Sequence, residues 1–233
     1  MFGIISEFYP LWVSSQVPLY EVKRWGTYLN DKKYGSKMRK QSTLEHIHSF
    51  CIFADAALIQ MMPYFPKVMI APLDQVLLMR SFRIHDHGEG LMKRDIPELL
   101  KDGNHDLEEY VAFMEHIKGQ PQIVQKEFQY AFLLQFALDN PPSFPDEARE
   151  IMKRISKRHY FEAMSFKALE RFEYSFYAYE MKDKNPNILP EVIERQFPHY
   201  QMYKDQLPGF EEVLFTEPVR KWMLSLIRSG VAA

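Results

Sequence analysis

The chain has 233 residues, of which 46% are hydrophobic and 26% are charged, and its formal net charge is −2. This composition is typical of a globular protein, and the near-neutral charge excludes a general electrostatic affinity for nucleic acid polymers or anionic membranes. Cys51 is the only cysteine, so no intrachain disulfide can form. There is no signal-peptide pattern and no apolar run of the ~18 residues that a membrane span needs. We therefore expect a cytoplasmic protein with no membrane partner.

Apolar residues recur at helical spacing along most of the chain, and strand-like alternation is nowhere sustained, so the sequence predicts an all-α fold. In chain order we expect an irregular aromatic arm, a polar loop and then helices separated by Gly and Pro breaks. The approximate ranges are 1–22 for the arm, 30–40 for the loop, and 43–62, 72–85, 105–118, 121–139, 145–181, 189–206 and 216–228 for the helices. The stretch 145–181 fits one bent helix or two. A single domain over residues 1–233 is expected.

The first long helix is expected to begin at a cap formed by Ser42 or Thr43, with Glu45 favouring its positive first turn. His46 lies in that first turn. Taken alone, it fits a surface or capping histidine, and His48 competes with it as a candidate metal ligand.

A polar cluster, Ile84-His85-Asp86-His87-Gly88-Glu89-Gly90, follows the next apolar helix. His85 and Asp86 offer an imidazole nitrogen and a carboxylate oxygen, both good ligands for a borderline divalent metal. Glu89 follows His85 by about one helical turn. His-Asp pairs also arise by chance on solvated helix ends, so the metal hypothesis depends on His46 joining this pair.

Taken together, the pattern Arg39-x5-Glu45-His46, then His85-Asp86-x-x-Glu89, then Asp95-Ile96-Pro97 resembles the HD superfamily of metal-dependent phosphohydrolases. It is most similar to the branch of small 5′-deoxynucleotidases, to which the Arg24-Trp25 pair is also similar. Two departures are that Arg94 replaces a glycine and that the loop after Trp25 is longer. The resemblance covers about residues 20–185 and leaves a helical C-terminal extension unmatched. It implies an HD-domain helical bundle and a homodimer.

The family's fourth metal ligand is a late Asp in a Lys-x-x-Asp context. Lys167-Ala168-Leu169-Glu170 is the best match here, which places Glu170 where the Asp belongs. Asp139 is the rival candidate. A solvated ion pair of Glu170 with Lys167 or Arg171 is the alternative without a metal.

The resemblance implies one divalent metal (Mn, Co, Fe, Zn or Mg) held by His46, His85, Asp86 and Glu170. It implies that Glu89 handles the attacking water and that Asp95 acts at the ester or sugar end of the substrate. The implied substrate-binding residues are Arg24, Trp25 and Arg39, with Lys93 or Arg94 as alternative phosphate ligands.

The expected function is hydrolysis of a small phosphomonoester, with a (deoxy)nucleoside 5′-monophosphate as the substrate. The first alternative is an HD phosphohydrolase acting on a diphosphate or cyclic nucleotide with two metals. His105 and His116 lie where some members of the superfamily carry extra metal-binding histidines, but their acidic segment favours a solvated helix over a second metal site. The second is a nucleotide-binding protein with poor turnover. We expect an aromatic stripe from Phe161 to Tyr179 to form core or dimer interface, with no role in binding.

Overall fold

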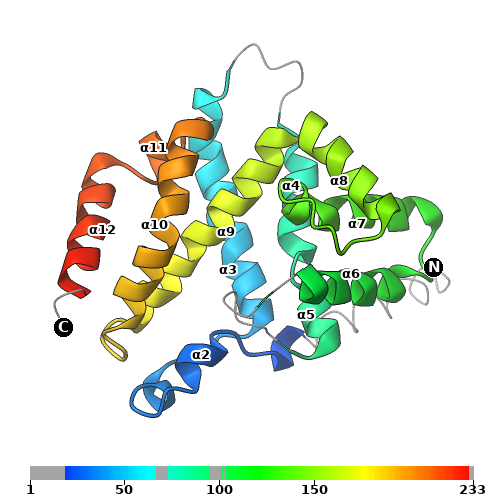
Figure 1. The fold of residues 1–233 in the computed structure, drawn as a ribbon. Coiled ribbons are helices and arrows are strands. Elements are labelled where there is room, and N and C mark those ends of the chain that lie inside the picture. Colours follow the sequence, from blue (N-terminus) through cyan, green and yellow to red (C-terminus); the bar gives the residue numbers. More distant parts are fainter. Residues whose placement is uncertain (1–18, 67–72, 95–100, 102, 231–233) are drawn as a thin grey trace, which may run out of the picture.

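The computed structural model describes residues 19–66, 73–94, 101 and 103–230 (Figure 1). Within these ranges the regular elements are helices, and the β-type pairing is an isolated bridge between Lys23 and Ser42. The all-α prediction is confirmed. No helix in this part of the chain is both long enough and apolar enough to cross a membrane.

The helices follow one another with short connections. The α-helices are α2 Gly26–Leu29, α3 Thr43–Met61, α4 Gln75–Ile84, α5 His87–Met92, α6 Gly103–Ile117, α7 Gln122–Leu133, α8 Asp146–Arg158, α9 Tyr160–Met181, α10 Ile188–Gln206, α11 Phe210–Val213 and α12 Glu217–Gly230. Short 3₁₀ turns occur at η1 Gly35–Lys37, η2 Met62–Tyr64 and η4 Leu134–Phe136.

Several helix boundaries differ from the predicted ones. The stretch 145–181 forms two helices, because His159 has φ −127° and ψ 40°, which interrupts the helical backbone between α8 and α9. The helix expected from Pro72 begins at Gln75, because the side chain of Asp74 accepts a hydrogen bond from the Leu77 amide at 2.9 Å and caps it there. Pro72 itself lies outside the described residues.

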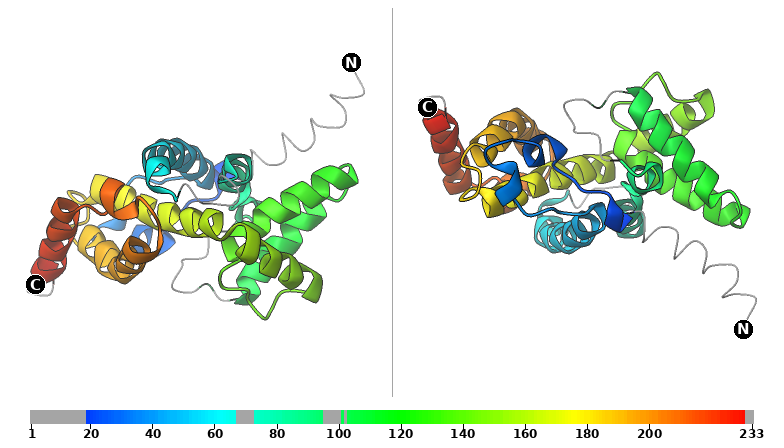
Figure 2. Two further views of the ribbon diagram at one scale, coloured as in Figure 1. Left: turned by 90° about the horizontal axis from the view of Figure 1, so that it is seen from above. Right: turned by 90° about the horizontal axis from the view of Figure 1, so that it is seen from below.

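Helix α9 runs through the middle of the molecule and packs against α3, α4, α8 and α10. The helix is apolar around much of its circumference, as expected of a helix buried among others. Figures 1 and 2 show α10 and α12 on one side of α9 and α6 to α8 on the other. Side chains from the middle of α9 therefore meet α3 and α4 as well as these two groups of helices.

A capping box fixes the start of α3. The Ser42 hydroxyl accepts a hydrogen bond from the Glu45 amide at 3.2 Å, and the Glu45 carboxylate accepts one from the Ser42 amide at 2.7 Å. This confirms the predicted cap and assigns it to Ser42. Because His46 follows Glu45 directly, the cap also sets the direction of the His46 side chain.

Candidate metal centre and its cavity

His46, His85 and Asp86 meet in the interior of the molecule. His46 Nε2 lies 3.3 Å from His85 Nε2 and 3.5 Å from Asp86 Oδ2, and His85 Nε2 lies 3.2 Å from Asp86 Oδ2. Ligands placed tetrahedrally at about 2.1 Å from a zinc-like ion would be roughly 3.4 Å apart. These three buried residues could therefore hold one metal ion without rearrangement.

The other nitrogen of each imidazole ring faces an acceptor. His85 Nδ1 lies 2.9 Å from the Phe82 carbonyl oxygen, and His46 Nδ1 lies 3.1 Å from Glu173 Oε2. A proton on each Nδ1 leaves both Nε2 atoms, which face each other, as the metal-binding atoms. The tautomers of the two histidines therefore suit a bound metal, as do the distances between the three ligand atoms.

Arg24 contacts the same carboxylate oxygen of Asp86 that faces the two histidines. Its Nη1 donates to Asp86 Oδ2 and lies 3.7 Å from Glu89 Oε2. Burial acts to raise the pKa of Asp86, but the neighbouring His85 and Arg24 outweigh it and hold that pKa well below its usual range. Burial acts to lower the pKa of His85, but Asp86 and Glu170 raise it above the usual value. Asp86 is therefore an anion at neutral pH, as a metal ligand must be.

Glu89 lies beside the triad in a more crowded acidic setting. Burial and the charge of Asp86 raise the pKa of Glu89 well above its ordinary value. Lys101 Nζ lies 3.4 Å from Glu89 Oε1 and 2.8 Å from Glu109 Oε1. Burial raises the pKa of Glu109 to about 7. Such groups can exchange a proton near neutral pH.

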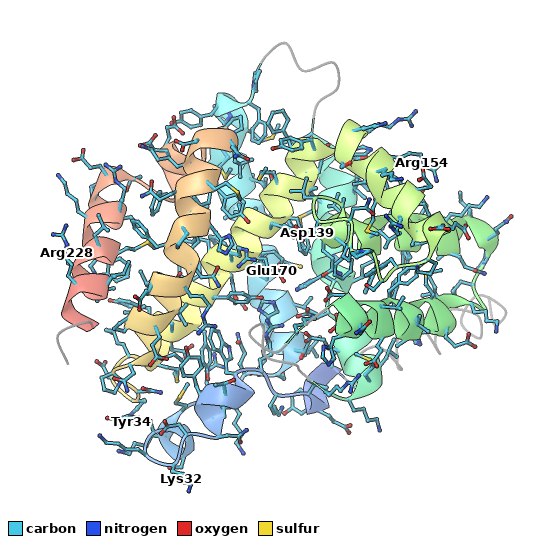
Figure 3. All side chains as sticks on the ribbon, in the orientation of Figure 1. Lys32, Tyr34, Asp139, Arg154, Glu170 and Arg228 are labelled. Atoms are coloured by element: carbon cyan, nitrogen blue, oxygen red, sulfur yellow. The ribbon has the colours of Figure 1, made fainter. Side chains whose placement is uncertain are left out.

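Glu170 and Asp139 differ in their distance from the triad. Glu170 Oε1 lies 3.8 Å from His85 Nε2, whereas Asp139 forms an ion pair with Lys167. Both side chains line the same cavity, and Figure 3 shows them next to the middle of α9. This geometry favours Glu170 as the fourth ligand.

Asp86 of the triad lines a cavity of about 300 Å³. Helices α2, α5, α6, α9 and α10 all contribute to its wall, which therefore crosses α9 from the α6 side to the α10 side (Figures 1 and 2). The polar, charged and aromatic side chains that line the cavity include Arg24, Trp25, Asp86, Glu89, Lys101, Asp106, Asp139, Lys167, Glu170, Arg171, Tyr174, Arg195 and Gln196. A volume of this size falls at the lower end of small-molecule sites.

Trp25 lies in this wall in a strained backbone conformation. Its φ of 69° is left-handed, which costs a non-glycine residue roughly 1–2 kcal/mol. The ring stacks on Tyr177 with centroids 4.5 Å apart, and Nε1 donates to Gln41 Oε1 at 2.9 Å. Tyr174 meets it edge-on and also lines the cavity, so the expectation that the aromatic stripe has no place in a binding site does not hold for Tyr174.

One residue predicted to belong to the site, Arg39, is not brought to it. Arg39 is part-exposed and pairs with Glu180 at 2.9 Å and Glu45 at 3.6 Å, and it does not line the cavity. The two carboxylates hold its guanidinium on the surface between α3 and the end of α9. Asp95 lies outside the described residues. Of the alternative phosphate ligands, Arg94 pairs with Glu108 on the surface.

Three charged residues of the site went unrecognised in the sequence: Glu173, Lys101 and Glu109. Glu173 follows Glu170 by three positions and so shares its helix face, which is a signal that could have found it. Lys101 and Glu109 carry no motif, because their pairing depends on how the chain before α6 lies against α5.

We compared the chain with protein-family models, curated proteins and solved structures. None of them matches it. The account of the site therefore depends on the geometry described above.

Proposed function

We propose that this protein is a metal-dependent phosphohydrolase that cleaves a phosphomonoester, with a (deoxy)nucleoside 5′-monophosphate as its substrate. The observation that carries the proposal is the buried triad of His46, His85 and Asp86, whose Asp86 lines a cavity that is also lined by Arg24, Lys101, Lys167, Arg171 and Arg195. Cationic side chains beside a metal centre suit an anionic substrate such as a phosphate ester.

The residues around the triad have distinct roles in metal binding and proton transfer. His46, His85 and Asp86 hold the metal, and Glu170 is the further carboxylate that faces the metal-binding nitrogen of His85. A divalent metal bound there would polarise a phosphoryl oxygen and lower the pKa of bound water. Glu89 is placed beside the triad to take or return a proton, because its carboxyl lies between Arg24 and Lys101.

Substrate binding is assigned to the rest of the cavity wall. Arg24 reaches the metal centre and is the first candidate for a phosphate ligand, with Lys167 and Arg171 of α9 beside it in the wall. Trp25 and Tyr174 supply flat apolar surfaces for a sugar or base. Arg39 is withdrawn from this role, because it pairs with Glu180 outside the cavity. The homodimer and the cytoplasmic location stay predictions.

The test is a phosphate-release screen on protein that has been stripped of metal and reloaded with Mn²⁺, Co²⁺, Fe²⁺, Zn²⁺ or Mg²⁺. We expect release from at least one nucleoside monophosphate. His85→Ala should abolish both metal binding and release, whereas Glu89→Gln should keep the metal and lose roughly 10²–10⁴-fold in turnover.

Two outcomes would contradict the assignment. Nucleotide binding without release under every metal would indicate a nucleotide-binding protein. Normal turnover in Glu89→Gln would remove Glu89 from the proton transfer. Faster release from diphosphates or cyclic nucleotides would keep the enzyme class and change the substrate.

A further inference from the structure

A second charged cluster adjoins the triad and is centred on Lys101. Its Nζ atom lies 2.8 Å from Glu109 Oε1, 3.4 Å from Glu89 Oε1 and 3.9 Å from Asp106 Oδ1. We call these four residues the lysine cluster. Glu89 and Glu109 are 3% and 1% exposed, so two of the three carboxylates are as buried as the ligands of the triad.

Three carboxylates around one point are the donor set of a hard divalent cation. In this protein the point is occupied by a side-chain ammonium, which has one positive charge and three N–H donors. The pKa of Lys101 is raised above its usual value: burial acts to lower it, but Glu89, Glu109 and Asp86 outweigh burial. Once all three carboxyls are ionised, one ammonium leaves an excess of negative charge, and a divalent ion would neutralise more of it.

Glu89 connects the lysine cluster to the metal centre. Its Oε1 faces Lys101, while its Oε2 lies 3.7 Å from Arg24 Nη1, which in turn contacts Asp86. The lysine cluster and the triad also share the cavity, which Asp86, Glu89, Lys101 and Asp106 all line. A cation held by the lysine cluster would therefore face the same bound molecule as a metal held by the triad.

We propose that the Lys101 ammonium stands in the place of a second divalent ion, so that the site works with one metal, and that neutralising this side chain opens the position to metal. In catalysis Lys101 would be a positioning residue that holds Glu89, and this role depends on the proposed function. The proposal that the Lys101 ammonium occupies a cation position in the lysine cluster does not depend on that function. A merely structural ion pair would change stability when removed and would leave the number of bound ions unchanged.

The number of bound Mn²⁺ ions tests this. It can be measured by equilibrium dialysis and calorimetry at about pH 8, where Glu109 of the parent, with a pKa of about 7, is mainly ionised. Because Lys101 lowers the pKa of Glu109, the variants that lack Lys101 are also titrated at higher pH. We expect Lys101→Met to bind one ion more than the parent protein. Adding Glu109→Gln to that variant should remove the extra ion, because it takes away one of the buried carboxylates.

Lys167→Met is the matched control. Lys167 lines the same cavity and also forms an ion pair, but with Asp139, whose side chain is 61% exposed. One exposed carboxylate is too weak a site for a divalent ion, so this variant should bind the same number of ions as the parent.

Two results would overturn the inference. One is a parent protein that already binds a second Mn²⁺ in the lysine cluster, shown by loss of that ion in Glu109→Gln. The other is a folded Lys101→Met variant that binds no more ions than the parent. If Lys101→Met does not fold by circular dichroism, Lys101→Gln gives the same prediction, because its amide is polar but uncharged. The combination His85→Ala/Lys101→Met separates this from the proposed function. It should lose the ion of the triad and keep the new one, whether or not any phosphate is released.

Discussion

Glu173 orients the ring of His46 from the side opposite the candidate metal. Its Oε2 lies 3.1 Å from His46 Nδ1, and its Oε1 accepts a hydrogen bond from the Ser49 hydroxyl at 3.4 Å. Burial acts to raise the pKa of Glu173, but His46 and the other neighbours outweigh it and lower that pKa. An ionised carboxylate behind a histidine fixes the tautomer and raises the basicity of the metal-binding nitrogen.

Glu173→Gln should weaken metal binding about 10–100-fold, because an amide gives a weaker partner for the His46 Nδ1 proton. Glu180→Gln is the control, since Glu180 lies on the same helix but pairs with Arg39 on the surface. Metal affinity by calorimetry is the measurement. Equal affinity in the two variants would show that Glu173 does not act through His46.

The fourth ligand can be decided by a pair of alanine variants. Glu170 Oε1 lies 3.8 Å from His85 Nε2, the metal-binding nitrogen of that residue, whereas Asp139 has no such contact with the triad in the described structure. We expect Glu170→Ala to weaken metal binding sharply and Glu170→Asp to retain part of it. Asp139→Ala should leave affinity unchanged, because Asp139 is held by Lys167. The reverse result in the two alanine variants would make Asp139 the ligand.

At the scale of elements, the contact between α5 and α6 brings the lysine cluster together. A Cβ atom on Gly88 would lie 2.6 Å from both the Cβ and the carbonyl oxygen of Glu109. Only a glycine lets α6 approach α5 this closely. The close approach carries Glu109 to Lys101 and, through it, to Glu89.

Gly88→Ala should therefore destabilise the protein by about 1–3 kcal/mol, because helix backbones must separate to admit the methyl group. Gly119→Ala is the control, since nothing lies within 4 Å of a Cβ built there. Urea unfolding gives both values. Equal free energies of unfolding for the two variants would mean that α5 and α6 can separate to admit the methyl group without loss of stability.

At the scale of the whole molecule, the charged groups of the interior gather where α3, α5, α6 and α9 meet. Their burial makes stability depend on pH. An unfolded Glu109 titrates near 4.5, whereas the folded residue titrates at about 7, so the folded state binds more protons between these values. The free energy of unfolding therefore falls as pH rises through this window, by about 3 kcal/mol for a gap of this size.

Glu109→Gln should remove that contribution. The free energy of unfolding of the variant minus that of the parent should be larger at about pH 8 than at about pH 5. Urea unfolding of both proteins at both pH values measures this difference. Glu89 changes in the same direction, because the charge of Glu109 contributes to the raised pKa of Glu89 and is removed in the variant. Glu108→Gln, on the exposed side of the same helix, is the control. If the difference in free energy of unfolding between variant and parent is the same at both pH values, the raised pKa of Glu109 in the folded protein is contradicted.

The sequence by itself determined the helical class and a cap at Ser42 or Thr43, because helix periodicity and capping act over a few residues. The pairing of His46 with the His85-Asp86 motif was predicted from the family resemblance of the two motifs taken together. The sequence also favoured Glu170 over Asp139, which agrees with its distance from His85.

Only the tertiary structure decided which charges meet across long separations in the chain. Arg39 pairs with Glu180 and so stays outside the cavity, while Glu173 reaches His46 and Lys101 gathers three carboxylates. The periodicity of a helix shows which of its faces is buried, but it does not show which neighbour that face meets. A charged side chain takes its role from that neighbour, because burial and the nearest opposite charge together set its pKa and its direction.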